Sequence, residues 1–355
     1  MSVQAGRERP SPFEALRGRN RPGVMSMLGI FFVVLIVVWL ARNFVDDPQE
    51  FLNVALIGLT TGAVYALIAL GYTLVYGILQ LINFAHGDVF ALSGLISSSI
   101  MIEVLHLSGQ EAAIVVAGGI LLTILMTMGF ASTLNASIEF LGYRRLRSQP
   151  RLTMLISAVG MSFIVQNVAL AIYDVNFRSA PPLIPSTPAF TLGEVSLAWN
   201  KLTVILITIP VLVVLTWLVR STKQGKAMRA TAQDQDAAAM MGINVNRTIS
   251  FTFVLAGGLA GAAGVLFLLQ FNMRYDTGFE LGLIAFTAAV LGGIGNLAGA
   301  TLGGLLIGFI QAFNEGLTIW SLGSDWTRSI VFGILIAILV FRPEGLLGER
   351  TPEGA

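Results

Sequence analysis

The chain has 355 residues, of which 55% are hydrophobic and only 12% are charged, and its formal net charge is +1. Soluble proteins carry about 25% charged residues, so this composition excludes a soluble globular enzyme and indicates a protein solvated largely by lipid. The near-neutral charge gives no electrostatic basis for nucleic-acid binding, and the absence of cysteine excludes disulfides and thiol catalysis.

The amino-terminal region combines a basic segment with a long apolar run. Residues 1–23 are polar and contain five arginines, whereas Met25–Ala41 is uninterrupted and apolar. We therefore predict a basic cytoplasmic tail at 1–23 and a first transmembrane helix at 24–45. A cleaved signal peptide is the alternative, but the run is longer than most signal-peptide cores and no A-x-A cleavage site follows it.

Further apolar stretches follow, most of them long enough for a membrane-crossing helix. They lie at residues 51–80, 88–105, 112–139, 152–173, 202–220, 249–271, 281–293, 299–318 and 329–341. If every stretch crosses once and the amino terminus is cytoplasmic, most lysines and arginines lie in the cytoplasm. The exceptions are Arg42, Arg178, Lys201, Arg274 and Arg328. This bias follows the positive-inside rule.

The pattern predicts an all-α fold, a polytopic transmembrane helical bundle of about ten membrane-crossing segments with both termini in the cytoplasm. The 281–293 and 329–341 stretches are short for full spans, so we expect broken or re-entrant helices there. The outer interval 174–201 is too short for an independent domain, and its prolines exclude a continuous helix.

The segment 81–88 interrupts the apolar pattern with an amide, an imidazole and a carboxylate, at Asn83, His86 and Asp88. A carboxylate inside the bilayer costs about 2.5–3.5 kcal/mol on insertion scales, so Asp88 requires a partner or water. Irregular backbone at membrane depth lines protein or a water-filled cavity. These three residues are therefore candidates for a translocation path or gate. The alternative is a tight turn at the interface in which Asp88 caps the next helix.

The segment 290–299 is rich in glycine, which weakens a helix. Gly293, Gly295 and Asn296 are therefore further candidates for a translocation path or gate. Glycines spaced four apart also let helices approach closely, and plain helix packing is the alternative role for any one pair. The pairs with this spacing include Gly58 and Gly62, Gly257 and Gly261, Gly295 and Gly299, and Gly304 and Gly308.

The largest interval predicted to be cytoplasmic is the loop 221–248. Asp234 and Asp236 favour the start of a short helix through the helix dipole, and Gly242 is placed to end it. The residues between them, Ala237–Met241, are small except for two methionines. Such a face suits docking into a groove of another protein. A lid that packs on the ends of the bundle fits the same residues.

The sequence contains no G-x-x-x-x-G-K-[ST] phosphate loop, no H-E-x-x-H and no cluster of metal ligands. We therefore predict a transport protein that is not an enzyme and that holds no metal or cofactor of its own. Energy for transport against a gradient then has to come from a partner or from an ion gradient.

Three stretches together resemble the permease subunits of branched-chain amino-acid ABC importers, in particular the shorter of the two permeases. They are Tyr65–Gly77 leading into Ile82–Asp88, Gly225–Ala230 through Met241–Asn244, and Phe286–Asn296 followed by Gly299 and Ala300. The resemblance extends over residues 51–348 and implies a permease domain at 46–348 with a short cytoplasmic tail at 349–355. Residues 1–45 are an addition to the usual family length.

The resemblance also implies partners and a mechanism. ABC permeases dock on their ATPase through a short coupling helix of pattern E-A-A-x-x-x-G, which Asp236, Ala237, Ala238 and Gly242 match with aspartate in place of glutamate. The implied importer uses ATP in two partner ATPase subunits, contains a second related permease, and receives its amino acid from an extracytoplasmic binding protein. It would work by alternating access in a prokaryotic inner membrane.

Two alternatives remain open at this point. A urea or short-amide ABC permease of the same family shares much of the pattern. An ion-coupled transporter acting alone, from a different functional class, would use Asp88 and Glu315 as coupling carboxylates and would need no ATPase.

Overall fold

A computed structural model describes residues 24–147 and 149–348. The predicted tails at 1–23 and 349–355 lie outside the described residues. The chain divides into two compact units, residues 1–48 and 49–355. In the first unit the described structure is the helix α2 (Val24–Asp46), which contains the predicted apolar run.

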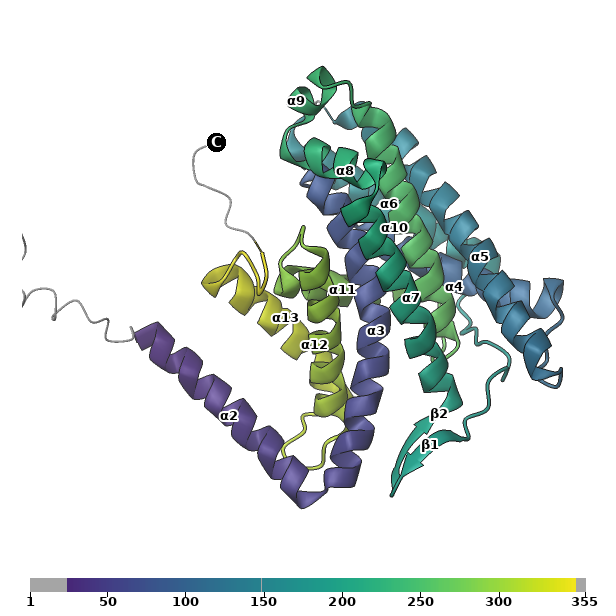
Figure 1. The fold of residues 1–355 in the computed structure, drawn as a ribbon, viewed down its shortest axis with the longest axis vertical. Helices are drawn as coiled ribbons and strands as arrows, with labels where there is room; N and C mark the ends of the chain where they lie inside the picture. Colours follow the sequence, from purple (N-terminus) through teal and green to yellow (C-terminus); the bar gives the residue numbers. More distant parts are fainter. Residues whose placement is uncertain (1–23, 148, 349–355) are drawn as a thin grey trace, which may run out of the picture. The chain divides into compact units, whose positions relative to one another are not determined.

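The second unit is almost entirely helical (Figure 1). Its α-helices begin with α3 (Pro48–Leu79), which starts at the boundary between the units. They continue with α4 (Ala85–Ser99), α5 (Ala113–Ile138), α6 (Arg151–Tyr173), α7 (Trp199–Ser221), α8 (Lys223–Gln233), α9 (Gln235–Met240), α10 (Val245–Leu268), α11 (Thr277–Gly292), α12 (Leu297–Gly316) and α13 (Ser324–Phe341). The π-helical turns η1 (Ile100–Val104) and η2 (Glu139–Tyr143) extend α4 and α5, and the 3-10 turn η3 (Arg144–Leu146) follows η2.

Each predicted apolar stretch is helical, so the all-α polytopic bundle is confirmed. In the described part of the chain, the helices long and apolar enough to cross a bilayer are α3, α4 with η1, α5 with η2 and η3, α6, α7, α10, α12 and α13. α11 is apolar but has only 16 residues, as expected of the 281–293 stretch. The expectation that 329–341 is too short is wrong, because its helix begins at Ser324 and reaches 18 residues.

The helices of the second unit form a buried centre and an apolar outer layer. In their most apolar segments, α3, α4 and α10 have 78%, 72% and 83% of the residues buried, whereas α6 and α7 have 22% and α13 has 11%. The outer helices expose large side chains such as Phe163, Val213 and Trp217. Water would penalise this arrangement and lipid would not, so the outer layer is the surface that meets the bilayer.

Glycines bring the central helices into backbone contact. A Cβ atom built on Gly304 of α12 would lie 2.5 Å from the Cα atom of Ala66 in α3, and one on Gly308 would lie 2.3 Å from the Cα atom of Gly62. A Cβ on Gly257 of α10 would lie 2.4 Å from the carbonyl oxygen of Ala131 in α5. The helix-packing interpretation of these glycines is therefore confirmed.

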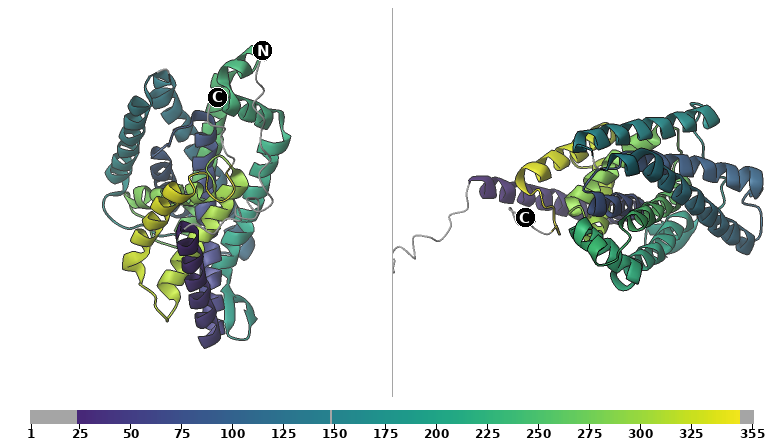
Figure 2. Two further views of the ribbon diagram at one scale, coloured as in Figure 1. Left: turned by 90° about the vertical axis from the view of Figure 1, so that its left-hand side faces the viewer. Right: turned by 90° about the horizontal axis from the view of Figure 1, so that it is seen from above.

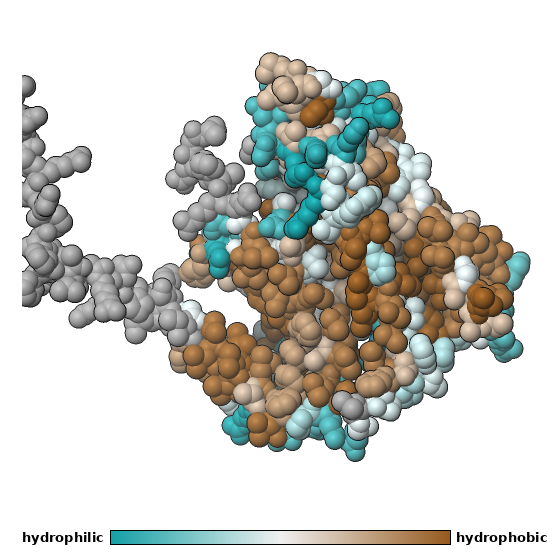
Figure 3. Space-filling view, in the orientation of Figure 1, coloured by the Kyte–Doolittle hydropathy of each residue, from teal (hydrophilic) through white to brown (hydrophobic). Residues whose placement is uncertain are grey.

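The two ends of the second unit carry different elements (Figures 1 and 2). One end holds α8 and α9. The opposite end holds a short antiparallel hairpin, β1 (Pro188–Leu192) with β2 (Val195–Ala198). No helix forms between Asp174 and Ala198, as the prolines predicted. Figure 3 shows a mainly hydrophobic middle between more hydrophilic ends.

Candidate functional site

The short helix α9 has a defined start and a defined end. Its N-cap is Asp234, whose Oδ1 accepts hydrogen bonds of 2.9 Å from the backbone N–H groups of Asp236 and Ala237. At the other end the N–H of Gly242 donates to the carbonyl of Ala239 and that of Ile243 to Ala238, both at 3.0 Å. This pair of hydrogen bonds is a Schellman motif, and Gly242 supplies the positive φ that it requires, at 83°.

The predicted coupling residues take different places on α9. Asp236 is exposed near the helix start, Ala237 is half-buried, and Ala238 is 4% exposed because it faces the bundle. Met240 and Met241 are each 83% exposed. The exposed apolar side chains at this end of the loop are therefore those of Met240 and Met241, whereas the side chain of Ala238 is buried.

α8 is an element that the sequence reasoning did not separate from the rest of the loop. Thr222 caps it by accepting a hydrogen bond from the N–H of Gly225 at 3.0 Å. Arg229 reaches back and donates to the carbonyl oxygens of Val219 and Arg220 at the end of α7. A cation that bonds the last carbonyls of a helix stabilises that end, so α8 is held against α7.

Asn83 joins three segments that are far apart in the sequence. Its amide donates to Oδ1 of Asn135 at 3.4 Å and its Oδ1 accepts from the hydroxyl of Tyr143 at 2.6 Å. Asn135 in turn donates to the carbonyl of Phe253 at 2.7 Å. Asn83 is 1% exposed, so it connects the α3–α4 turn to α5 and α10 within the interior of the bundle.

His86 and Asp88 are also inside the protein. The ring of His86 packs edge-on against Tyr72 with 4.8 Å between ring centroids. Asp88 is 1% exposed and accepts a hydrogen bond from Ser162 of α6. α4 begins at Ala85, so Asp88 lies inside its first turn. The interpretation of Asp88 as a helix cap is therefore wrong.

The glycine-rich turn between α11 and α12 holds the carboxy-terminal segment 342–348. The N–H groups of Leu346 and Leu347 donate to the carbonyls of Leu291 and Gly292 at 2.8 and 2.9 Å. Gly293 has φ 105°, and a Cβ atom there would lie 2.4 Å from the backbone nitrogen of Gly348. The absence of a side chain at this position lets the two backbones pair.

Asn296 fixes the same turn from the other side. Its Oδ1 accepts from the N–H of Gly299 at 3.1 Å, which caps α12, and its amide donates to the carbonyl of Leu347 at 2.8 Å. Gly293 and Asn296 therefore anchor the carboxy-terminal segment, whereas Gly295 (φ 96°) has open space around its Cα hydrogen position.

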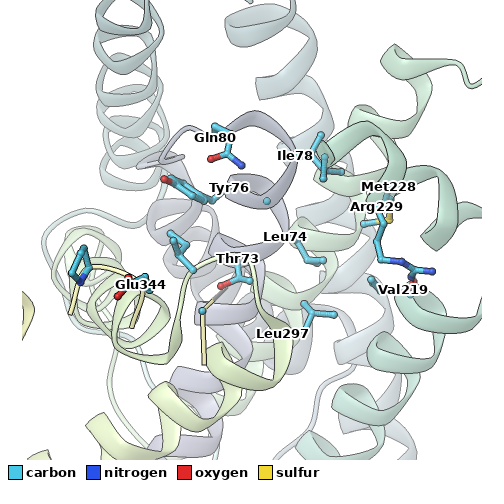
Figure 4. Close-up of a pocket in the computed structure, with 16 residues that line it drawn as sticks. Thr73, Leu74, Tyr76, Ile78, Gln80, Val219, Met228, Arg229, Leu297 and Glu344 are labelled. Atoms are coloured by element: carbon cyan, nitrogen blue, oxygen red, sulfur yellow. The ribbon is translucent and has the colours of Figure 1, made fainter. Parts of the chain in front are cut away.

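A cavity of about 850 Å³ lies at the α8 end of the bundle (Figure 4). Of the six predicted path or gate residues, Gly295 is the one that lines it. The other lining residues are Thr73, Leu74, Tyr76, Gly77, Ile78, Gln80, Val219, Met228, Arg229, Ala232, Ile294, Leu297, Pro343, Glu344 and Gly348. The volume is in the range of small-molecule sites, and the wall mixes apolar side chains with hydroxyl, amide and charged groups.

The sequence reasoning missed the polar wall of this cavity. Thr73 and Tyr76 lie three residues apart near the end of α3, which places them on one face of the helix, and Gln80 directly follows its last residue. The polar side chains that gather at the end of this largely apolar helix are the signal that would have found them. Of the six predicted path or gate residues, Asn83, His86 and Asp88 lie in the bundle interior, whereas Gly293, Gly295 and Asn296 lie in or next to the α11–α12 turn.

The sequence of this chain is similar to those of permeases from branched-chain amino acid transport systems. The profile of a family described as branched-chain amino acid transport system permease component matches residues 54–340. The chain is 38% identical over 301 residues to the high-affinity branched-chain amino acid transport system permease protein BraD of Pseudomonas aeruginosa, covering 83% of this chain and 95% of that protein. It is 36% identical over 319 residues to LivH, a permease protein with the same description, of Escherichia coli K12, covering 88% and 99%.

A shorter part of the chain matches a permease of a different import system. The chain is 34% identical over 159 residues, 44% of each chain, to the autoinducer 2 import system permease protein LsrC of Klebsiella pneumoniae. No solved structure matches the chain significantly.

Proposed function

Since the chain belongs to the permease family of branched-chain amino-acid transport systems, we propose that it is the multi-pass membrane permease of an ABC importer that takes up branched-chain amino acids. The observation that carries this proposal is the helix α9. It is a capped, six-residue helix at one end of the bundle, and its last residue Met240 and its C-cap residue Met241 are exposed. Flexible, polarisable methionine side chains adapt to a partner's groove.

The sequence has no phosphate loop for binding ATP, so the proposed importer needs partner subunits that hydrolyse it. We propose that two ATPase subunits bind and hydrolyse ATP, that α9 is the coupling helix on which one of them docks, and that a second related permease completes the path. An extracytoplasmic binding protein would deliver the amino acid to the hairpin end. This arrangement requires α8 and α9 on the cytoplasmic side of a prokaryotic cell membrane, and we propose that both termini lie on the same side.

α9 is connected directly to two of the central helices of the bundle, α3 and α10. The amide of Gln235, the first residue of α9, donates to the carbonyl of Ile78 in α3 at 3.4 Å. On the other side, residues 241–244 lead directly into α10, which Asn244 caps by accepting from the N–H of Arg247 at 3.0 Å. A displaced α9 would therefore move the end of α3 and the start of α10, which are two of the central helices.

The cavity is the proposed cytoplasmic end of the translocation path. It is bordered by α3, α7, α8, the α11–α12 turn and the carboxy-terminal segment, so it adjoins the end of α3, which is one of the elements that α9 would move. Its apolar wall, which includes Leu74, Met228 and Leu297, suits a branched aliphatic side chain. Its polar groups suit the charged ends of an amino acid.

Replacing both Met240 and Met241 by glutamate tests the docking role. We expect the ATPase recovered with the purified permease to fall roughly tenfold or more, because buried apolar anchors dominate interface energies. The matched control is Phe190→Glu in the hairpin, where an apolar side chain 63% exposed at the opposite end is changed in the same way. Full recovery of ATPase with the double variant would rule out α9 as the docking site.

Uptake by vesicles that contain the whole importer tests the substrate and the source of energy. We expect ATP-dependent uptake of labelled leucine, no uptake of urea, and no uptake by the purified chain alone under an ion gradient. Uptake of urea instead of leucine would favour the short-amide alternative. Ion-driven uptake without an ATPase would replace the proposal with the single-chain transporter.

A further inference from the structure

A buried carboxylate, that of Glu139, lies at the end of α5, outside the proposed docking helix and the cavity. α5 passes at Glu139 into the π-helical turn η2, and Glu139 is 0% exposed. π-Helical turns within membrane helices often mark functional positions. A carboxylate at such depth requires positive partners, since an unpaired buried charge strongly destabilises a protein.

Two arginines supply the positive charge. Arg144 donates through Nε to Oε1 of Glu139 and through Nη2 to Oε2, both at 3.2 Å. Arg147 donates through Nη2 to Oε1. The fork-like contact of Arg144 with both carboxylate oxygens fixes the orientation of the carboxylate. Glu139, Arg144 and Arg147 are called the α5 clamp below.

The α5 clamp also bonds to the beginning of α10. The hydroxyl of Ser250 donates to Oε2 of Glu139 at 2.8 Å and accepts from Nη2 of Arg144 at 2.6 Å. Nη1 of Arg147 donates to Oδ1 of Asn246 at 2.8 Å. Asn246 and Ser250 lie one turn apart in the first turns of α10, so the clamp holds that end of α10 against the end of α5.

The α5 clamp contacts the part of α10 that directly follows the proposed coupling helix α9. α10 begins only a few residues after α9, so the first turns of α10 receive any displacement of the coupling helix. Asn135 lies one turn before Glu139 and donates a hydrogen bond to the carbonyl of Phe253 in α10. Tyr143 lies one turn after Glu139 and donates to Asn83 in the α3–α4 turn. Polar contacts of neighbouring turns at the end of α5 therefore link α10 to the turn that follows α3.

We propose that Glu139 is a positioning residue that couples motion of α9 to the transport helices. This inference rests on the proposed function and adds to it the residue through which α10 and α5 move together. The buried ion pair is suited to the task because its bonds are directional and break only at high cost. Coupling is measured as the amount of amino acid transported for each ATP hydrolysed.

The experiment uses the complete importer in proteoliposomes with an excess of binding protein. Glu139→Gln removes the charge and keeps the size of the side chain. We expect the permease to retain its ATPase subunits and their ATP hydrolysis, while the leucine transported per ATP hydrolysed falls at least fivefold. Glu139→Asp, which keeps the carboxylate, is expected to recover part of that ratio. A purely structural defect would lower assembly, hydrolysis and transport together.

The matched control is Glu103→Gln. Glu103 also lies in a π-helical turn, η1, but it is exposed and accepts a hydrogen bond only from Ser99 among the described residues. We expect its transport ratio to equal that of the wild type. A second pair of variants, Ser250→Ala and Asn246→Ala, loosens the clamp from the α10 side without leaving a buried charge unpaired. Each is expected to lower the ratio about two- to threefold.

The outcomes separate this inference from the proposed function. An unchanged ratio in Glu139→Gln, Ser250→Ala and Asn246→Ala, in complexes that hydrolyse ATP, overturns the coupling role alone. Loss of the ATPase subunits in Glu139→Gln together with an unchanged ratio in the two α10 variants also overturns it. A wild-type complex that takes up no amino acid overturns the proposed function and the coupling role with it.

Discussion

At the residue scale, the hydroxyl and amide side chains of the apolar helices differ in whether they have partners. Thr60 in α3 donates to the carbonyl of Leu56 at 2.9 Å, as threonines in helices commonly do. Thr73 in the same helix is 1% exposed, and its Oγ1 atom has no hydrogen-bond partner within the described structure. A buried hydroxyl without a partner costs about 1–3 kcal/mol, and Thr73 borders the cavity.

Thr73→Val tests whether the cavity belongs to the translocation path. The change removes the hydroxyl and keeps the shape, so we expect folded yield to stay the same or to rise. We expect the leucine uptake rate to fall about two- to tenfold, the equivalent of one hydrogen bond. Thr127→Val is the matched control, because Thr127 is equally buried, also lacks a partner among the described residues, and does not border the cavity. Equal uptake in the two variants would contradict the role of the cavity.

Asn296 allows two roles of one side chain to be separated. Asn296→Ala removes both the cap of α12 and the bond to Leu347, so we expect a loss of about 1–2 kcal/mol in the free energy of unfolding. Asn296→Asp keeps an oxygen for the Gly299 N–H and loses the amide donor, so its stability should lie between alanine and wild type. Thermal unfolding of the detergent-purified complex provides the measurement. An aspartate variant as unstable as alanine would show that the carboxy-terminal contact dominates.

At the element scale, the close approach of α3 and α12 depends on the lack of side chains. Gly62 faces Leu305 and Gly308 of α12, and a Cβ atom on Gly308 would meet the backbone of both Gly58 and Gly62. Backbones this close leave few voids and many van der Waals contacts, which drive helix association where lipid removes the hydrophobic effect. The glycines of these helices therefore set the distance between them.

Gly308→Val should separate α3 from α12. Inserting a side chain where no space exists typically costs about 1–3 kcal/mol, and backbone contacts cannot relax as side chains do. We expect lower folded yield and earlier thermal unfolding, measured by size-exclusion chromatography after heating. Gly333→Val in α13 is the control, because nothing lies within 4 Å of a Cβ atom built on Gly333. Similar stability of the two variants would refute the packing argument.

At the scale of the whole molecule, the second unit has two hydrophilic ends and a hydrophobic middle (Figure 3). The proposed function requires the α8–α9 end in the cytoplasm and the hairpin end outside. The distribution of lysine and arginine favours the same orientation. Since the chain contains no cysteine, a single introduced cysteine provides a unique chemical label.

Membrane-impermeant maleimide applied to intact cells tests this orientation. Phe190→Cys in the hairpin should be labelled in intact cells, whereas Met241→Cys should be labelled only after the membrane is permeabilised. Both side chains are well exposed in this chain, 63% for Phe190 and 83% for Met241, so in cells that express it without its proposed partners access to the thiol is decided by the membrane alone. The opposite labelling pattern would invert the molecule and exclude docking of a cytoplasmic ATPase on α9.

Much of this protein could be predicted from local features of its sequence. The helices at the apolar stretches follow from their length, because a bilayer requires about 20 apolar residues per crossing. The start of α9 near Asp234 and its end at Gly242 follow from capping chemistry within a few residues. The interhelical bond of Asn135 and the close packing at the spaced glycines also match the chemistry of those residue types.

The tertiary structure decided which distant residues meet. It placed Asn83, His86 and Asp88 in the bundle interior, buried Ala238, and joined Glu139 of η2 to Ser250 of α10. It also assembled the cavity from α3, α7, α8 and the carboxy-terminal segment. None of these follows from composition or spacing, because each depends on the packing of helices that are far apart in the chain. Sequence periodicity fixes the faces of one helix, whereas the partner of each face is set by the whole bundle.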